Sequence, residues 1–82
     1  PMEVRKHIGY LPESVPVYGE MRVREYLAYR AKLKGVGRHG RTARIDYCMQ
    51  KSRVKGVENR LLNTLSKGYR QRVGLADTLL AD

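Results

Sequence analysis

Apolar residues recur at steps of three and four along three stretches of the chain, and this spacing constrains the fold more than any other feature. Because an α-helix has about 3.6 residues per turn, this spacing places the apolar side chains on one face of each stretch. The three stripes are Val23, Tyr26, Leu27 and Ala31, then Ile45, Cys48 and Met49, and finally Tyr69, Val73, Ala76 and Leu80. The pattern therefore predicts a mainly α fold of about three to four helices.

Glycines and charged residues mark where these helices end. We predict helices over Met21 to Lys34, Thr42 to Arg53 and about Ser66 to Leu80. Gly35 favours the end of the first one, since glycine adopts the left-handed conformation that closes many helices. In the last one, Leu75 and Leu79 are expected to widen the buried face. The segment from Val57 to Leu65 is predicted to be a helical turn followed by a loop.

The N-terminal part of the chain reads differently from the helical remainder. A short apolar run, His7-Ile8-Gly9-Tyr10-Leu11, ends at Pro12. Proline pushes the residue before it toward an extended conformation, so the run is predicted to be the end of a β-strand. Pro12 to Glu20 follows as a loop. We therefore expect a short strand remnant ahead of the helices.

The charge of the chain points to an anionic environment. Its 82 residues include 17 Lys and Arg against 8 Asp and Glu, which gives a net charge of +9. Two interpretations stay open: the cations cover solvated helix faces, or the chain is a small basic helical module that binds nucleic acid. The sequence has no run of about 18 apolar residues, the length that a membrane-spanning helix needs.

Metal chemistry and thiol chemistry find little support in the sequence. Cys48 is the only cysteine and lies on an apolar stripe, so we expect a buried structural residue instead of a reactive thiol. His7 and His39 are far apart and have no Cys or carboxylate at a ligand spacing. No metal site is predicted.

The start of the last predicted helix is the segment that carries chemistry. Ser66 stands at the N-cap position, where its hydroxyl can accept a hydrogen bond from a backbone N–H of the first turn. Gly68 lacks a Cβ and lets a ligand approach the backbone, while Lys67 adds a positive charge. Because the first N–H groups of a helix are unpaired, such a segment can hold a phosphate. Helix capping alone explains the same residues, so both interpretations stay open here.

A longer stretch around these residues resembles a known family. The string Leu65-Ser66-Lys67-Gly68-Tyr69-Arg70-Gln71-Arg72-Val73-Gly74-Leu75-Ala76 closely resembles the signature segment of ABC-type ATPases. Upstream, Ile8-Gly9-Tyr10-Leu11-Pro12-Glu13 resembles the loop after a core strand of that family, and Glu20 to Leu27 is similar to its first subdomain helix. The resemblance covers nearly the whole chain and is greatest to ATP-binding subunits of the ABC-2 exporter type. It implies that residues 1–20 comprise the end of a core strand plus a Q-loop-like segment. Residues 21–82 would form the helical subdomain ending in the signature helix.

The resemblance also implies roles for individual residues. The implied ATP-binding residues are Leu65, Ser66, Lys67, Gly68 and Tyr69. Ser66 and Gly68 would contact the γ-phosphate of an ATP held by a second ATP-binding subunit. Glu13 takes the place usually filled by Gln, the implied catalytic position that couples Mg²⁺ and the attacking water to movement of the subdomain.

Two departures from the family pattern affect the helix start. Lys67 replaces the usual Gly, and its role toward phosphate is left open. Tyr69 replaces the usual Gln, which could complete a capping box with the serine, so the helix start is expected to rely on Ser66 alone. Glu13 in place of Gln is compatible with Mg²⁺ coordination but changes the local charge.

Two ATPase motifs of the family are missing from the sequence. The phosphate loop G-x-x-x-x-G-K-[ST], or Walker A segment, has no match, and the aspartate strand with the catalytic glutamate, the Walker B segment, is absent as well. We therefore expect ATP hydrolysis, with ATP and Mg²⁺ as cofactors, only in an intact longer protein. The 82 residues alone are expected to be inactive and to carry no bound cofactor.

The resemblance further implies partners and a location. The expected partners are a membrane-spanning transporter subunit and a second ATP-binding subunit, with no nucleic acid. The expected location is the cytoplasm, at the cytoplasmic face of the membrane through the transporter complex. Within the loop Ser14 to Gly19, Val15, Val17 and Tyr18 look exposed. This loop is either the contact with the coupling helix of the membrane subunit or a plain surface loop.

Overall fold

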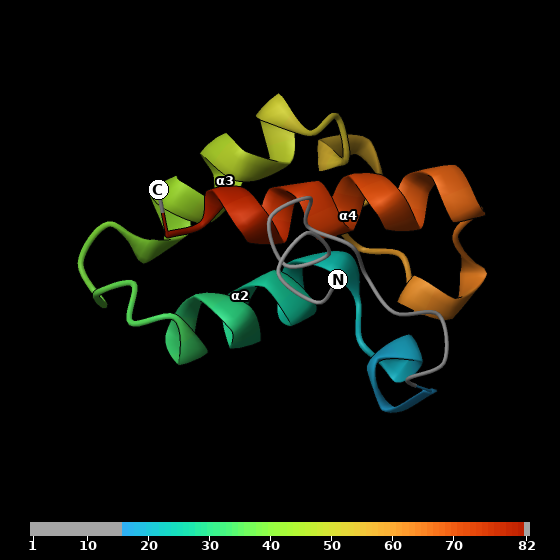
Figure 1. Ribbon diagram of the computed structural model, residues 1–82, viewed down its shortest axis with the longest axis horizontal. Helices are drawn as coiled ribbons and strands as arrows, with labels where there is room; N and C mark the ends of the chain where they lie inside the picture. Colours follow the sequence, from blue (N-terminus) through green and yellow to red (C-terminus); the bar gives the residue numbers. More distant parts are fainter. Residues whose placement is uncertain (1–15, 82) are drawn as a thin grey trace, which may run out of the picture.

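The computed structural model describes residues 16–81, and this part of the chain is mainly helical (Figure 1). Its α-helices are α2 (Val23–Leu33), α3 (Arg41–Lys51) and α4 (Lys67–Leu79). Three short 3-10 helices, η1 (Pro16–Glu20), η2 (Lys55–Val57) and η3 (Leu62–Thr64), connect or precede them. The mainly α prediction is confirmed. The predicted strand remnant, His7 to Leu11, lies outside the described residues, as does Glu13.

The three α-helices enclose one apolar core, because each of them contacts the other two (Figure 1). The buried residues are Val23, Tyr26, Leu27, Ala31, Ile45, Cys48, Met49, Val54, Leu62, Leu65, Val73, Ala76 and Leu80. The first two predicted stripes are all in this set, and Cys48 is fully buried as expected. The third stripe is buried except for Tyr69, which is half-buried and packs against the core.

The end of α2 follows the sequence prediction closely. Gly35 has a left-handed φ of 79° and donates its N–H to the carbonyl of Lys32 at 3.2 Å. The next residue, Val36, donates to the carbonyl of Ala31 at 2.9 Å. These two bonds are the Schellman motif, in which a left-handed residue satisfies carbonyls that the helix end leaves unpaired.

The end of α3 differs from the prediction, which extended this helix to Arg53. The helix ends at Lys51, and Arg53 adopts the left-handed conformation, with φ 60°. Arg53 donates to the carbonyl of Gln50 at 3.2 Å, and Val54 donates to the carbonyl of Met49 at 2.9 Å. Val54 is fully buried. The chain turns back here because the turn brings Val54 into the core, which offsets the conformational cost at Arg53.

Leu75 also departs from the prediction. It was expected to widen the buried face of the last helix, but 45% of its surface is exposed. The buried residues Val73, Ala76 and Leu80 face α2 and α3, and Leu75 lies on the opposite side of the same helix. Leu79 is half-buried and does pack against the core. Among residues 16–81, no helix combines the length and the apolar character needed to cross a bilayer.

Candidate functional site

The first turn of α4 has the geometry that its sequence predicts. Ser66 is the N-cap residue, with an extended backbone at φ −65° and ψ 162°. Its Oγ accepts a hydrogen bond from the N–H of Tyr69 at 3.2 Å, and its carbonyl accepts from the N–H of Arg70 at 2.9 Å. An N-cap serine leaves the N–H groups of the first two helical residues, here Lys67 and Gly68, directed out of the helix end.

The space in front of this turn is open. Ser66, Lys67 and Gly68 are all exposed. A Cβ added to Gly68 would meet only the Oγ of Ser66, at 4.0 Å. Glycine in a helix is less favourable than alanine by about 0.5–1 kcal/mol, and no packing contact within the described residues requires it here. The glycine therefore costs stability and leaves room at the backbone for an approaching group.

Leu65 and Tyr69 flank the open turn and attach it to the core. Leu65 is only 5% exposed, so its side chain is packed in the core and is not accessible to a ligand in front of the turn. Tyr69 is half-buried against the core, and the guanidinium of Arg72 lies 5.1 Å from its ring centroid. This distance allows a cation–π contact. Both residues fix the position of the helix start, and Ser66 provides its side-chain cap.

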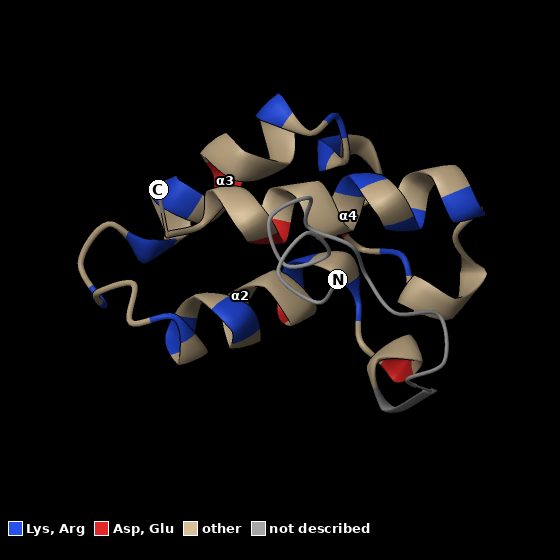
Figure 2. Ribbon diagram, viewed as in Figure 1, with Lys and Arg blue, Asp and Glu red and all other residues tan. Residues whose placement is uncertain are grey.

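Charge along α4 is unevenly distributed. Its N-terminal half carries Lys67, Arg70 and Arg72 and has no acidic residue, whereas Asp77 lies in the C-terminal half (Figure 2). The partial positive charge of the helix N-terminus adds to these cations. The open turn is thus an electropositive surface with outward-facing backbone N–H groups, an arrangement that favours a phosphate or another small anion.

An ion-pair cluster that the sequence did not predict holds the other half of α4. The carboxylate of Asp77 lies 2.9 Å from Nε of Arg30 and 3.2 Å from Nζ of Lys34, both on α2. The hydrogen bond to Asp77 raises the pKa of Arg30 above its usual value. From α3, Arg44 donates to the carbonyls of Leu79 and Leu80 at the end of the helix. The spacing of four between Arg30 and Lys34 was the available sign of a shared anion on a neighbouring helix.

The segment before α2 is a helical turn packed against the rest of the molecule. Tyr18 of η1 was expected to be exposed, but it is half-buried and meets Tyr26 edge-on, with ring centroids 5.3 Å apart. A Cβ on Gly19 would come within 3.0 Å of Cβ of Asn63, so η1 lies directly against η3. Glu13, the predicted catalytic position, and Val15 lie outside the described residues.

Other candidate sites are few among the described residues. No group of three or more His, Cys, Asp or Glu residues within 16–81 is placed to hold a metal ion. A shallow cleft of about 360 Å³ is lined by Lys34, Gly35, Val36, Arg44, Leu80 and Ala81. It lies beside the C-terminal end of α4, away from the open first turn.

Known proteins with similar sequences are ATP-binding proteins of transporters. Residues 2–82 match the family described as ABC transporter. The chain is 35% identical over 83 residues to the ABC transporter ATP-binding protein NatA of Bacillus subtilis (strain 168), covering 100% of this chain and 34% of NatA. It is 31% identical over 77 residues to the uncharacterized ABC transporter ATP-binding protein YhaQ of the same organism, covering 94% of this chain and 26% of YhaQ. To the taurine import ATP-binding protein TauB of Burkholderia pseudomallei (strain 1710b) it is 39% identical over 62 residues, covering 76% of this chain and 24% of TauB.

The chain spans about a quarter to a third of the length of these relatives. No solved structure matches the chain significantly. The family resemblance seen in the signature-like string and in the upstream loop is thereby confirmed. The finer assignment within this family, to the ABC-2 exporter type, stays a prediction.

Proposed function

The chain belongs to the ABC transporter family, and from that premise we propose that it is the helical part of a subunit that binds and hydrolyses ATP to drive transport. In this proposal residues 21–82 are the helical subdomain, and residues 1–20 link it to the ATP-binding core. The observation that carries the proposal is the open first turn of α4, with Ser66 as its cap and Gly68 leaving its backbone accessible.

The ligand proposed for this turn is the γ-phosphate of an ATP held by a second ATP-binding subunit. The Ser66 hydroxyl and the backbone N–H of Gly68 are the groups that would donate to its oxygens. To do so, the Ser66 hydroxyl can donate its hydrogen outward while its lone pair accepts from Tyr69, so capping and binding are compatible. A terminal phosphate at this place also gains from the helix dipole.

Lys67 and Tyr69 have different proposed roles at the first turn of α4. Lys67 is exposed and adds a positive charge, so we assign it electrostatic attraction of the phosphate. Tyr69, with its ring packed on the core and beside Arg72, positions the helix start. Leu65 contributes its buried side chain as an anchor. Glu13 is proposed as the position that couples Mg²⁺ and the attacking water to the subdomain.

The partners follow from the same proposal. The Walker A and Walker B segments, which have no match in residues 1–82, would be supplied by further parts of the ATP-binding subunit. The segment Ser14 to Gly19 is proposed to face the coupling helix of a membrane-spanning subunit, on the cytoplasmic side of the membrane. In support, η1 is packed against both η3 and Tyr26 of α2. A displacement of η1 would therefore be transmitted to η3 and α2. We propose no nucleic-acid partner, because the family match over residues 2–82 is to ABC transporters.

A pair of glycine substitutions tests the phosphate role in the intact ATP-binding subunit. Gly68→Asp puts a carboxylate where the phosphate would lie, and we expect the ATPase rate to fall by about 100-fold or more, as when one transition-state donor is lost. Gly37→Asp is the matched control, because Gly37 is also exposed and a Cβ there meets nothing within 4 Å. It should leave the rate unchanged. Equal rates in the two variants would disprove the phosphate role of this turn.

A further inference from the structure

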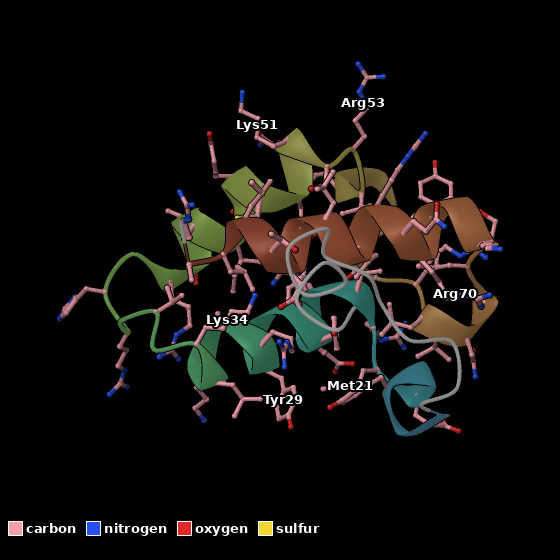
Figure 3. All side chains as sticks on the ribbon, viewed as in Figure 1. Met21, Tyr29, Lys34, Lys51, Arg53 and Arg70 are labelled. Carbon is pink, nitrogen blue, oxygen red and sulfur yellow. The ribbon has the colours of Figure 1, made fainter. Side chains whose placement is uncertain are left out.

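The outward face of α3 carries an exposed aromatic ring set among cations. Ile45, Cys48 and Met49 turn toward the core, so Tyr47 points the opposite way, with 47% of its surface exposed. The guanidinium carbon of Arg44 lies 5.1 Å from the Tyr47 ring centroid, and Nζ of Lys51 lies 5.7 Å from it. Lys51 and Arg53 project from the molecule at the end of this helix (Figure 3). We call Tyr47, Lys51 and Arg53 the α3 face.

The positive charge of this face is not compensated nearby. Neither Lys51 nor Arg53 forms an ion pair with an acidic residue among residues 16–81. The one acidic residue of α3, Asp46, is bound by Lys55 at 2.8 Å and by Arg24 at 3.8 Å. The hydrogen bond from Lys55 lowers the pKa of Asp46, so this carboxylate stays charged and occupied. The α3 face is therefore free to attract an external anion.

We propose that the α3 face is a contact surface for an anionic lipid bilayer. Tyrosine is favoured at membrane–water interfaces, where its ring meets the apolar edge and its hydroxyl meets water. Lys and Arg beside it are attracted to acidic headgroups, each with a factor of about five in binding. A bilayer is a flat partner, whereas a bound peptide needs a groove, and the cleft described above is lined by none of Tyr47, Lys51 and Arg53.

Nucleic acid fits the same face less well. Proteins that bind single strands stack bases on the flat faces of aromatic rings. At Tyr47 the two cations already lie over the ring, within 5.7 Å of its centroid, where a stacked base would have to lie. This arrangement obstructs stacking. The proposal does not depend on the phosphate role of α4, because the α3 face and the first turn of α4 have no residue in common.

Vesicle sedimentation of the 82-residue chain tests the proposal. Phosphatidylcholine vesicles are compared with and without phosphatidylserine, at low and at high salt. We expect binding only with phosphatidylserine and loss of binding at high salt. The double variant Lys51→Gln/Arg53→Gln should bind about 30-fold more weakly, because two cations are lost from the surface. Tyr47→Ser, which keeps the net charge, should also weaken binding.

A charge-matched control separates a defined face from general attraction. Lys32→Gln/Arg38→Gln removes two exposed cations from elsewhere on the molecule and should have a much smaller effect. Far-UV circular dichroism checks that each variant keeps its helices. An equal loss for the two double variants would overturn the proposal. So would a chain that ignores phosphatidylserine vesicles but binds single-stranded DNA through Tyr47.

Discussion

The two ends of α4 are built in opposite ways. Its C-terminal half is held by the buried residues Ala76 and Leu80, by the ion pairs of Asp77 with α2, and by Arg44 from α3. At the other end Leu65 and Tyr69 pack against the core, whereas Ser66, Lys67 and Gly68 are exposed and the Ser66 hydroxyl caps the helix. The Asp77 ion pairs therefore lie at one end of the helix and the accessible backbone N–H groups at the other. A helix held in this way can present its first turn to a ligand.

The largest expected effect comes from the core at the anchored end. Leu80→Ala removes a side chain that is 2% exposed and should lower the free energy of unfolding by about 3 kcal/mol. Leu75→Ala, on the exposed side of the same helix, is the matched control and should change it by less than about 1 kcal/mol. Urea titration followed by circular dichroism measures both. Similar losses would mean that the anchored end is not where α4 is stabilised.

The next effect concerns the ion pairs. Asp77→Asn leaves Arg30 and Lys34 without their shared carboxylate and should cost about 2 kcal/mol. This is below the usual cost of breaking a fully buried pair, because the three side chains remain 14–29% exposed and are partly screened. Glu20→Gln removes one negative charge from an exposed position and should be close to neutral. The same titration distinguishes the two, and a neutral Asp77→Asn would contradict the anchoring role of this residue.

A smaller effect is expected at the capped end. Ser66→Ala deletes the N-cap bond to Tyr69 and should destabilise the chain by about 1 kcal/mol. Ser52→Ala is a control, because the buried Oγ of Ser52 bonds to none of the described residues. Removing that hydroxyl should cost little or be slightly favourable. If Ser52→Ala proved the more damaging of the two, the cap would not be what holds the first turn.

The smallest effect should have the opposite sign. Gly68→Ala introduces a better helix former into open space and should stabilise the isolated chain by about 0.5 kcal/mol. In the intact ATP-binding subunit the same methyl group would crowd the proposed phosphate, so activity should fall while stability rises. Thermal unfolding and ATPase rates measured on the two proteins test this opposition. A variant that is both more stable and fully active would remove the reason for a glycine here.

Local features of the sequence predicted much of this molecule. The spacing of Val23, Leu27 and Ala31 places one helix, and Gly35 ends it, since both depend only on residues close in the chain. Ser66 likewise caps its helix as expected. Features that need a distant partner were missed. The end of α3 depends on burying Val54 in the shared core, and no local breaker marks it.

The candidate site divides in the same manner. The cap and the open backbone at Ser66 and Gly68 could be predicted, because they belong to one turn. Asp77 could not, since its importance arises from two cations more than forty positions earlier in the chain, on α2. The half-burial of Tyr18 also depends on another element, the rings of Tyr26 and Tyr29 on α2. The γ-phosphate contact stays a prediction, because it requires a second molecule.

The ion pairs of Asp77 hold α4 near its C-terminal end, far from the N-cap residue Ser66 at the other end. Eleven positions separate Asp77 from Ser66, which is about 16 Å of helix at about 1.5 Å per residue. If a tilt of α2 turned α4 by about 5° about Asp77, the hydroxyl of Ser66 would move by about 1.4 Å. This distance is roughly half the length of a hydrogen bond. Because Leu65 and Tyr69 attach the first turn to the core, such a rotation would carry these two side chains with it and would make or break contact with a fixed anion.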